Sequence, residues 1–98
     1  MIDHQQARQI ATHWLLAHPR RGPHGVVELR LLGEHTIESD FGWVFFWQSQ
    51  RFLETGNSSD QLAGNAPLIL GRRDGALQVT GTAHPIERYI QRYLPGLK

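Results

Sequence analysis

The sequence predicts an α+β fold with an N-terminal helix, an antiparallel sheet of about four strands and a C-terminal helix, and with both helices on one face of the sheet. Three observations support this prediction. Apolar residues recur at helical spacing near both ends of the chain, they alternate at strand spacing between the two ends, and the length of 98 residues suits one small domain. The sequence therefore predicts a single domain over residues 1–98.

The first helix is predicted to begin after Asp3, an N-cap residue with Gln6 in the capping-box position behind it. The residues that follow place one apolar stripe along a helix, made of Ala7, Ile10, Ala11, Trp14 and Leu15. The helix should end near His18, because the residue before a proline disfavours the α conformation. Residues 19–25 then form a basic turn, and alternation over 26–32 predicts a strand with one exposed side.

Residues 40–47 (DFGWVFFW) are dense in aromatic side chains, which favours a pleated strand. Residues two apart share a face of a strand, so one face should carry Phe41, Trp43, Phe45 and Trp47, and the other Val44 and Phe46. Both faces need cover, and two helices on one side leave the second face without it. That face is either closed by the polar loop 55–67 or open to another chain. Residues 52–54 are expected to extend this strand or to pair with it.

The second half of the chain predicts a hairpin followed by a helix. Asp74-Gly75 supplies the positive φ of a tight turn between strands at 68–70 and 76–80. Pro85 suits the first turn of a helix, where its missing N–H has no hydrogen-bond partner to lose. The apolar stripe of that helix consists of Ile86, Tyr89, Ile90, Tyr93 and Leu94.

Composition and charge argue against several classes of partner and location. Ten Lys and Arg against nine Asp and Glu give a net charge of +1, far too little for the phosphate neutralisation that drives nucleic-acid binding. The longest apolar run, residues 43–47, is much shorter than the ~20 residues of a membrane-spanning helix. The chain has no cysteine, and its first residues lack the pattern of a signal peptide, so we expect a cytoplasmic protein.

No pattern in the sequence predicts an enzyme. The histidines never lie four apart as in helical metal-binding motifs, and the serines have no histidine and acid at a fixed spacing. The glycine-rich segments lack the lysine and the helix start of a phosphate-binding loop. We therefore expect no catalytic residue, no metal site and no cofactor.

Four sequence blocks together resemble one family of small bacterial proteins. The blocks are DFGWVFFW at 40–47, LETG at 53–56, LAGNAPLI at 62–69 and VTGTAHPIE at 79–87. In this order and spacing the chain is similar to the immunity protein 35 family, also called YrhB-like domains, over nearly its whole length. The resemblance implies a protein of bacterial polymorphic toxin systems that binds a cognate toxin domain stoichiometrically and inhibits it without catalysis.

On this hypothesis, a sheet face or edge and the loop 55–67 contact the toxin. The candidate contact residues are polar or aromatic positions near the aromatic strand: Glu38, Asp40, Trp47, Arg51, Asn57 and Asp60. Trp47 is included because an exposed tryptophan is a frequent anchor in protein interfaces.

Two alternatives stay open at this point. Some YrhB-like proteins are described as chaperone-like and heat-stable, and such a role implies weak binding of unfolded clients through the second apolar face of the sheet. Self-association of two copies through the aromatic face, as a homodimer, is compatible with either function.

Overall fold

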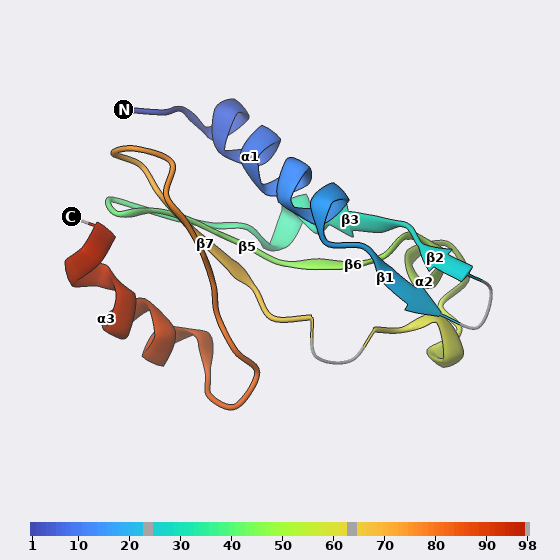
Figure 1. Cartoon of the computed structure of the whole chain (residues 1–98). Helices are drawn as coiled ribbons and strands as arrows, with labels where there is room; N and C mark the ends of the chain where they lie inside the picture. Colours follow the sequence, from blue (N-terminus) through green and yellow to red (C-terminus); the bar gives the residue numbers. More distant parts are fainter. Residues whose placement is uncertain (23–24, 63–64, 98) are drawn as a thin grey trace.

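The computed structural model describes residues 1–22, 25–62 and 65–97, with side chains as far as Arg92. The molecule is elongated, with extents of 41 × 27 × 22 Å (Figure 1). In chain order its elements are α1 His4–Ala17, β1 Arg20–Gly22, β2 Gly25–Val27, β3 Leu29–Leu31, the 3₁₀ turn η1 Gly33–His35, β4 Ile37–Ser39, β5 Gly42–Phe45, β6 Trp47–Ser49, α2 Gln50–Thr55, the 3₁₀ turn η2 Ser58–Asp60, β7 Leu68–Gly71, β8 Leu77–Val79 and α3 Ile86–Leu97.

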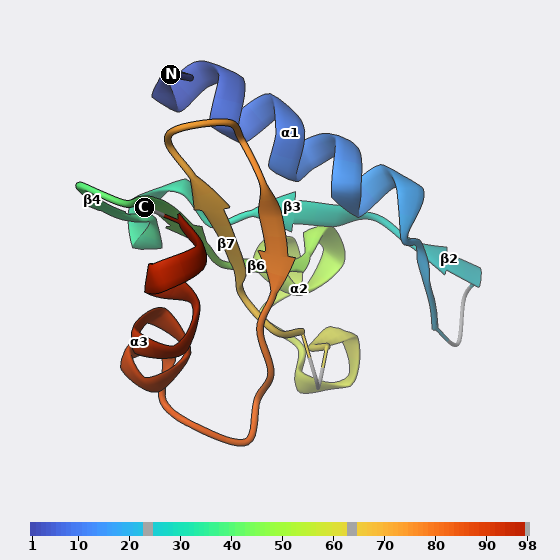
Figure 2. The ribbon, with the colours of Figure 1, turned by 60° about the vertical axis from the view of Figure 1, so that its left-hand side comes forward.

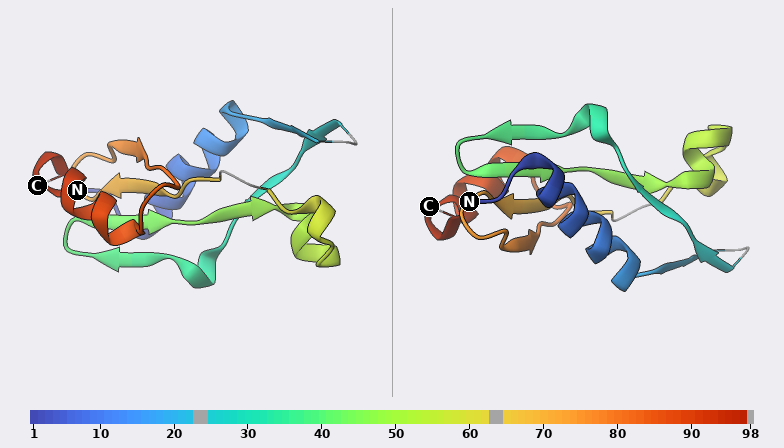
Figure 3. Two further views of the ribbon diagram at one scale, coloured as in Figure 1. Left: turned by 90° about the horizontal axis from the view of Figure 1, so that it is seen from below. Right: turned by 90° about the horizontal axis from the view of Figure 1, so that it is seen from above.

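A four-stranded antiparallel sheet in the order β4-β5-β7-β8 forms the centre of the fold. Beyond Phe46 the chain continues from β5 into β6, which pairs with β3, and β1 and β2 form a separate hairpin. Figure 3 shows β5 and β6 running along the molecule from the β4–β5 turn at one end to α2 at the other. The predicted α+β class, with a helix near each end of the chain and antiparallel strands between them, is confirmed.

The two terminal helices lie on opposite faces of the central sheet (Figures 1 and 2), so the prediction of both helices on one face is wrong. Helix α1 buries Ala7, Ala11 and Leu15 against one face. Helix α3 packs Tyr89 against the other. The physical reason is that β5 and β7 are buried on both sides, and a sheet that is apolar on both sides needs a covering element on each.

The aromatic strand divides its side chains between these two faces. The α1 side holds Trp43, Phe45 and Trp47, and the α3 side holds Val44 and Phe46, as predicted. Phe41 was expected on the Trp43 face and lies instead with the α3 cluster. It stands in the turn before Gly42, whose φ of 144° interrupts the alternation of an extended strand. Because α3 covers the second face, neither the loop 55–67 nor another chain is needed to close it.

The predicted capping box of the first helix, the predicted hairpin turn and part of the predicted apolar stripe of the last helix are confirmed. The Asp3 carboxylate accepts from the Gln6 N–H at 2.8 Å, and Gln6 Oε1 accepts from the Asp3 N–H at 2.9 Å, which completes the capping box of α1. Gly75 takes a φ of 73° in the β7–β8 turn. The predicted stripe of α3 is confirmed for Ile86, Tyr89 and Ile90, whereas the side chains of Tyr93 and Leu94 lie outside the described part of the chain.

Two local predictions are wrong. Residues 52–54 belong to helix α2 and do not extend or pair with the aromatic strand. The Ser49 hydroxyl caps α2 by accepting from the Phe52 N–H at 2.9 Å, so the last residue of β6 is also the residue that starts the helix. The basic turn at 19–25 is largely the β1–β2 hairpin, with Arg20 opposite Val27, while Pro23 and His24 lie outside the described residues.

Candidate functional site

The structure divides the candidate contact residues between the two ends of the molecule (Figure 3). Glu38 and Asp40 lie in β4 and in the β4–β5 turn at one end. Arg51, Asn57 and Asp60 lie in α2 and in the segment that follows it, at the other end. These two groups therefore belong to separate surfaces.

Trp47 is buried, with 2% of its surface exposed, and the expectation of an exposed anchor is wrong. Its Nε1–H donates to the carbonyl oxygen of Ala66 at 2.8 Å, and its own carbonyl oxygen accepts from Nδ2 of Asn65 at 2.6 Å. The guanidinium of Arg20 lies over its ring, with Cζ 5.3 Å from the ring centroid. Trp47 holds the chain before β7 against β6, and that role requires burial.

A hollow of about 490 Å³ lies between the β1–β2 hairpin and the segment containing α2 and η2, and we name it the hairpin cleft. Its lining includes Val26 and Val27 of the hairpin and Leu62 after η2. The charged side chains that line it are Arg21, Glu28, Arg51, Glu54 and Asp60. Two of the candidate contact residues, Arg51 and Asp60, thus face the same hollow.

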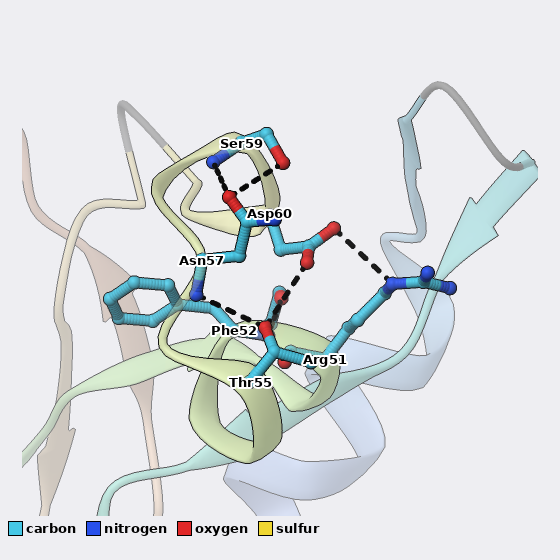
Figure 4. A network of polar contacts seen from close by, with 7 residues as sticks. Arg51, Phe52, Thr55, Asn57, Ser59 and Asp60 are labelled. Atoms are coloured by element: carbon cyan, nitrogen blue, oxygen red, sulfur yellow. Dashed lines mark hydrogen bonds and ion pairs between the residues drawn. The ribbon is translucent and has the colours of Figure 1, made fainter.

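Arg51 and Asp60 form an ion pair with Nε 3.4 Å from Oδ1 (Figure 4). The Thr55 hydroxyl lies 2.9 Å from the Arg51 carbonyl oxygen and 3.2 Å from Asp60 Oδ2, so both oxygens compete for its hydrogen. Asn57 Oδ1 accepts from the N–H and the hydroxyl of Ser59 at 3.1 and 3.0 Å. The Asp60 side chain is 14% exposed and the Arg51 side chain 61%, so the carboxylate is held in the network while much of the arginine remains open to solvent.

Gln48 was not predicted as a site residue, and it connects the cleft to the sheet. It is 7% exposed, and its Oε1 accepts from the main-chain N–H groups of Ser49 and Leu62, both at 2.8 Å. A buried carbonyl oxygen with two main-chain donors fixes the chain after η2 beside β6. A glutamine inside an aromatic strand carries no sequence signal of this role, because its partner Leu62 lies 14 residues away.

Exposed apolar side chains lie beside the hairpin cleft. A second hollow of about 320 Å³ shares Val26, Val27, Glu28 and Gln50 with the cleft. Leu16 and Val26 line it and are 75% and 63% exposed. Apolar side chains beside a charged, hydrogen-bonded rim are typical of a surface that binds another protein.

The opposite end of the molecule carries a smaller polar cluster around Glu38. Arg72 Nη2 lies 3.3 Å from Glu38 Oε2 and donates to the carbonyl oxygen of Ser39 at 2.8 Å. Its Cζ lies 4.4 Å from the centroid of the Trp43 ring. The Trp43 indole, whose buried Nε1–H makes no hydrogen bond of ordinary geometry, and the Arg72 guanidinium both favour the charged carboxylate and lower the pKa of Glu38 below its ordinary 4.5. Asp40 is exposed beside this cluster.

Both ends of the described structure carry charged side chains that are accessible to a binding partner. Within residues 1–22, 25–62 and 65–97, no group of three or more histidine, aspartate or glutamate side chains is placed to hold a metal ion. None of the helices in these ranges combines the length and apolar character that crossing a membrane requires. The hairpin cleft supplies a solvent-facing arginine, further charged side chains and adjacent apolar surface, which suit contact with a folded protein.

Comparison with known proteins gives one family and one relative. The family described as immunity protein 35 matches residues 5–92 of the chain. A protein of Escherichia coli strain K12, described as "Uncharacterized protein YrhB", is 46% identical over 52 residues. Those residues are 53% of this chain and 55% of the E. coli protein, so the match spans about half of that relative. No solved structure matches the chain.

Proposed function

Because this chain belongs to the immunity protein 35 family, we propose that it binds the toxin domain of a bacterial toxin system stoichiometrically and neutralises it. The observation that carries the proposal is the family match, which extends over residues 5–92 and includes both ends of the sheet. The protein acts by covering a surface of the toxin, in the cytoplasm of the producing cell, without a cofactor and without turnover.

The hairpin cleft is the toxin-binding surface in this proposal. Arg51 is held on one side by Asp60, so it loses little conformational freedom when a partner binds its open side. Asn57 keeps the η2 segment in shape through its bonds to Ser59. The exposed Val26, which lines the cleft, adds apolar area, and burial of apolar area is the main favourable contribution to most protein association.

The size of the molecule is sufficient for tight inhibition. A dissociation constant of ~1 nM corresponds to about 12 kcal/mol, and interfaces of that class bury roughly 1,600 Å² in total, or about 800 Å² on each partner. The chain exposes 6397 Å², so the contact would use about one eighth of its surface. The β1–β2 hairpin and α2 lie at the same end of the molecule (Figure 3), and residues of both line the cleft, so this end offers the area for such a contact.

The chaperone-like alternative depended on an open second apolar face of the sheet. That face is covered by α3, with Tyr89 8% exposed at the contact. A chaperone using this face would first have to release α3, and no observation favours that. We therefore retain the immunity function.

A co-purification experiment tests the function. A toxin domain encoded beside this protein is produced with it, and the mixture is purified through a tag on this protein. We expect a 1:1 complex, and we expect cells that carry both proteins to grow where cells with the toxin alone do not. A toxin that is not retained at ~10 µM, or equal retention of many unrelated unfolded proteins, would contradict the proposal.

Single substitutions then test the surface. Arg51→Ala removes a cleft side chain while Thr55 still contacts Asp60, and it should weaken toxin binding 10- to 100-fold. Arg73→Ala is the matched control, because Arg73 is also an exposed arginine but lies in the β7–β8 turn and does not line the cleft. Asp40→Ala and Glu38→Ala examine the other end. A loss in these two variants with none in Arg51→Ala would place the contact at the β4–β5 end.

A further inference from the structure

Strand β8 forms an open edge of the central sheet. It is the last strand in the order β4-β5-β7-β8, and among the strands of the described residues only β7 pairs with it (Figure 2). The main chains of Ala76 and Thr80 bond to β7 and the residue before it, at 2.9 and 3.0 Å. Bonded positions alternate along an antiparallel strand, so Gln78 also faces β7 while Leu77 and Val79 turn their N–H and C=O groups to the open side.

The two edges of this sheet differ in charge. Open edges are commonly protected by charged residues or proline, since an unpaired strand is a template for another strand. On the β4 edge, Glu38 is charged and Arg72 bonds to the Ser39 carbonyl oxygen. β8 reads Leu77-Gln78-Val79, carries no charge, and exposes 43% of Val79. The β8 edge is therefore the unprotected one.

We propose that β8 pairs with β8 of a second copy of the chain, antiparallel, around a two-fold axis at Gln78. The outward main-chain groups of β8 allow this register. Leu77 forms N–H···O=C hydrogen bonds in both directions with Val79 of the second copy, and the two-fold axis repeats these bonds between Val79 and Leu77 of the second copy. The side chain of Leu77 then lies beside that of Val79 of the second copy on the α1 side of the sheet. The two sheets join into one continuous sheet.

Charge favours this edge and this occupant. Around an axis at Gln78, the next residues outward pair Ala76 with Thr80, so no like charges face each other. The same arrangement at β4 would set Glu38 against Glu38 of the second copy, and like charges directly opposite each other destabilise a strand pair. The edge is thus complementary to itself. Each face of the aromatic strand, which the sequence suggested for self-association, is covered within the molecule, one by α1 and the other by α3.

Sedimentation velocity tests the pairing. A contact of one short edge strand predicts a weak dimer, monomeric at ~1 µM and largely associated by several hundred micromolar. Val79→Lys places a charge on the β8 edge and should keep the protein monomeric through that range. Ile37→Lys is the matched control, because Ile37 is 37% exposed on the opposite edge strand, and this variant should associate like the wild type. A wild type that stays monomeric, or a Val79→Lys variant that still associates, would overturn the proposal.

A cysteine variant tests the register and does not depend on the behaviour of Val79→Lys. The chain has no cysteine, so a single introduced thiol can form only an intermolecular disulfide. Residues on the axis of a non-hydrogen-bonded pair have Cα atoms about 4.5 Å apart, a separation that a disulfide can bridge. Gln78→Cys should therefore form a disulfide dimer at least 10-fold faster than Ala76→Cys, whose counterpart lies opposite Thr80. Equal rates, or a faster Ala76→Cys variant, would contradict a two-fold axis at Gln78.

Discussion

The indole Nε1–H of Trp47 donates a 2.8 Å hydrogen bond to the carbonyl oxygen of Ala66, across 19 residues of sequence. Trp47, together with Gln48, thereby attaches the chain after η2 to the strand β6. The hairpin cleft depends on this bond indirectly, because Leu62 lines the cleft and lies in the same segment. A residue that resembles a surface anchor in the sequence is an internal support in the structure.

Trp47→Phe should reduce the free energy of unfolding by about 2 kcal/mol, because it removes the donor and leaves the buried Ala66 carbonyl without its partner. Trp43→Phe is the matched control. Trp43 is fully buried too, but its Nε1–H has no hydrogen-bond partner of ordinary geometry, so the loss should be about 1 kcal/mol smaller. Urea denaturation of both variants measures the difference, and an equal loss would show that the Trp47 bond contributes little.

Gly42→Ala should destabilise the protein by about 3 kcal/mol or more. The φ of 144° disfavours any side chain, and an added Cβ would collide with the Leu70 carbonyl oxygen on β7. In Gly33→Ala, by contrast, the new Cβ meets no atom of residues 1–22, 25–62 and 65–97 within 4 Å, and the stability should change by less than about 1 kcal/mol. Thermal unfolding of the two variants provides the measurement. Similar melting temperatures would argue against the close approach of β5 and β7 at Gly42.

Gln48→Ala should lower both stability and toxin binding, because it leaves the N–H groups of Ser49 and Leu62 without their buried acceptor. We expect a loss of about 2 kcal/mol in unfolding free energy. Because Leu62 lines the cleft, toxin affinity should fall as well, measured by calorimetry at a temperature where the variant is folded. Gln9→Ala, at an exposed position of α1 that does not line the cleft, should leave both quantities near the wild-type values. If the toxin affinity of Gln48→Ala equals that of the wild type, the toxin does not bind at the hairpin cleft.

The Glu38 cluster predicts a specific dependence of stability on pH. Its contacts lower the pKa of Glu38 in the folded state, so the charged carboxylate stabilises the fold. That contribution is present above the pKa of the unfolded chain, near 4.5, and is lost as the pH falls through the lower folded pKa. The melting temperature of Glu38→Gln should therefore fall less steeply below pH 4.5 than that of the wild type.

Arginine variants identify the cause of that slope. Arg72→Met removes a cation that contacts Glu38. In this variant the melting temperature should fall less steeply with decreasing pH than in the wild type, although the effect should be smaller than in Glu38→Gln. Arg73 is a neighbour in the same turn and is not part of the ion pair, so Arg73→Met should show the same acid dependence of the melting temperature as the wild type. If the melting temperatures of both Glu38→Gln and Arg72→Met fall with pH as steeply as that of the wild type, the Glu38 cluster is not the cause of the acid dependence.

Signals that act over a few residues can be read from the amino-acid sequence. The capping box of Asp3 and Gln6, the Asp74-Gly75 turn and the helix after Pro85 each depend on neighbours within four positions. The exception is the short helix α2. Its N-cap residue Ser49 follows directly after the aromatic run, which predicts a strand, so the start of the helix is not evident from the sequence. A strand that is apolar on both faces is also evident from alternation alone, because residues two apart must share a face.

By itself the sequence determined the α+β class, the order of most elements, most of the side-chain alternation of the aromatic strand and the family resemblance. The tertiary structure alone decided which helix covers which face, that Trp47 is buried, that Gln48 holds Leu62, and that Arg51 and Asp60 meet in a cleft. The physical reason is distance along the chain. Periodicity and capping are local, whereas burial and cross-chain hydrogen bonds depend on which distant segments come into contact, and a single sequence does not encode those contacts in any local pattern.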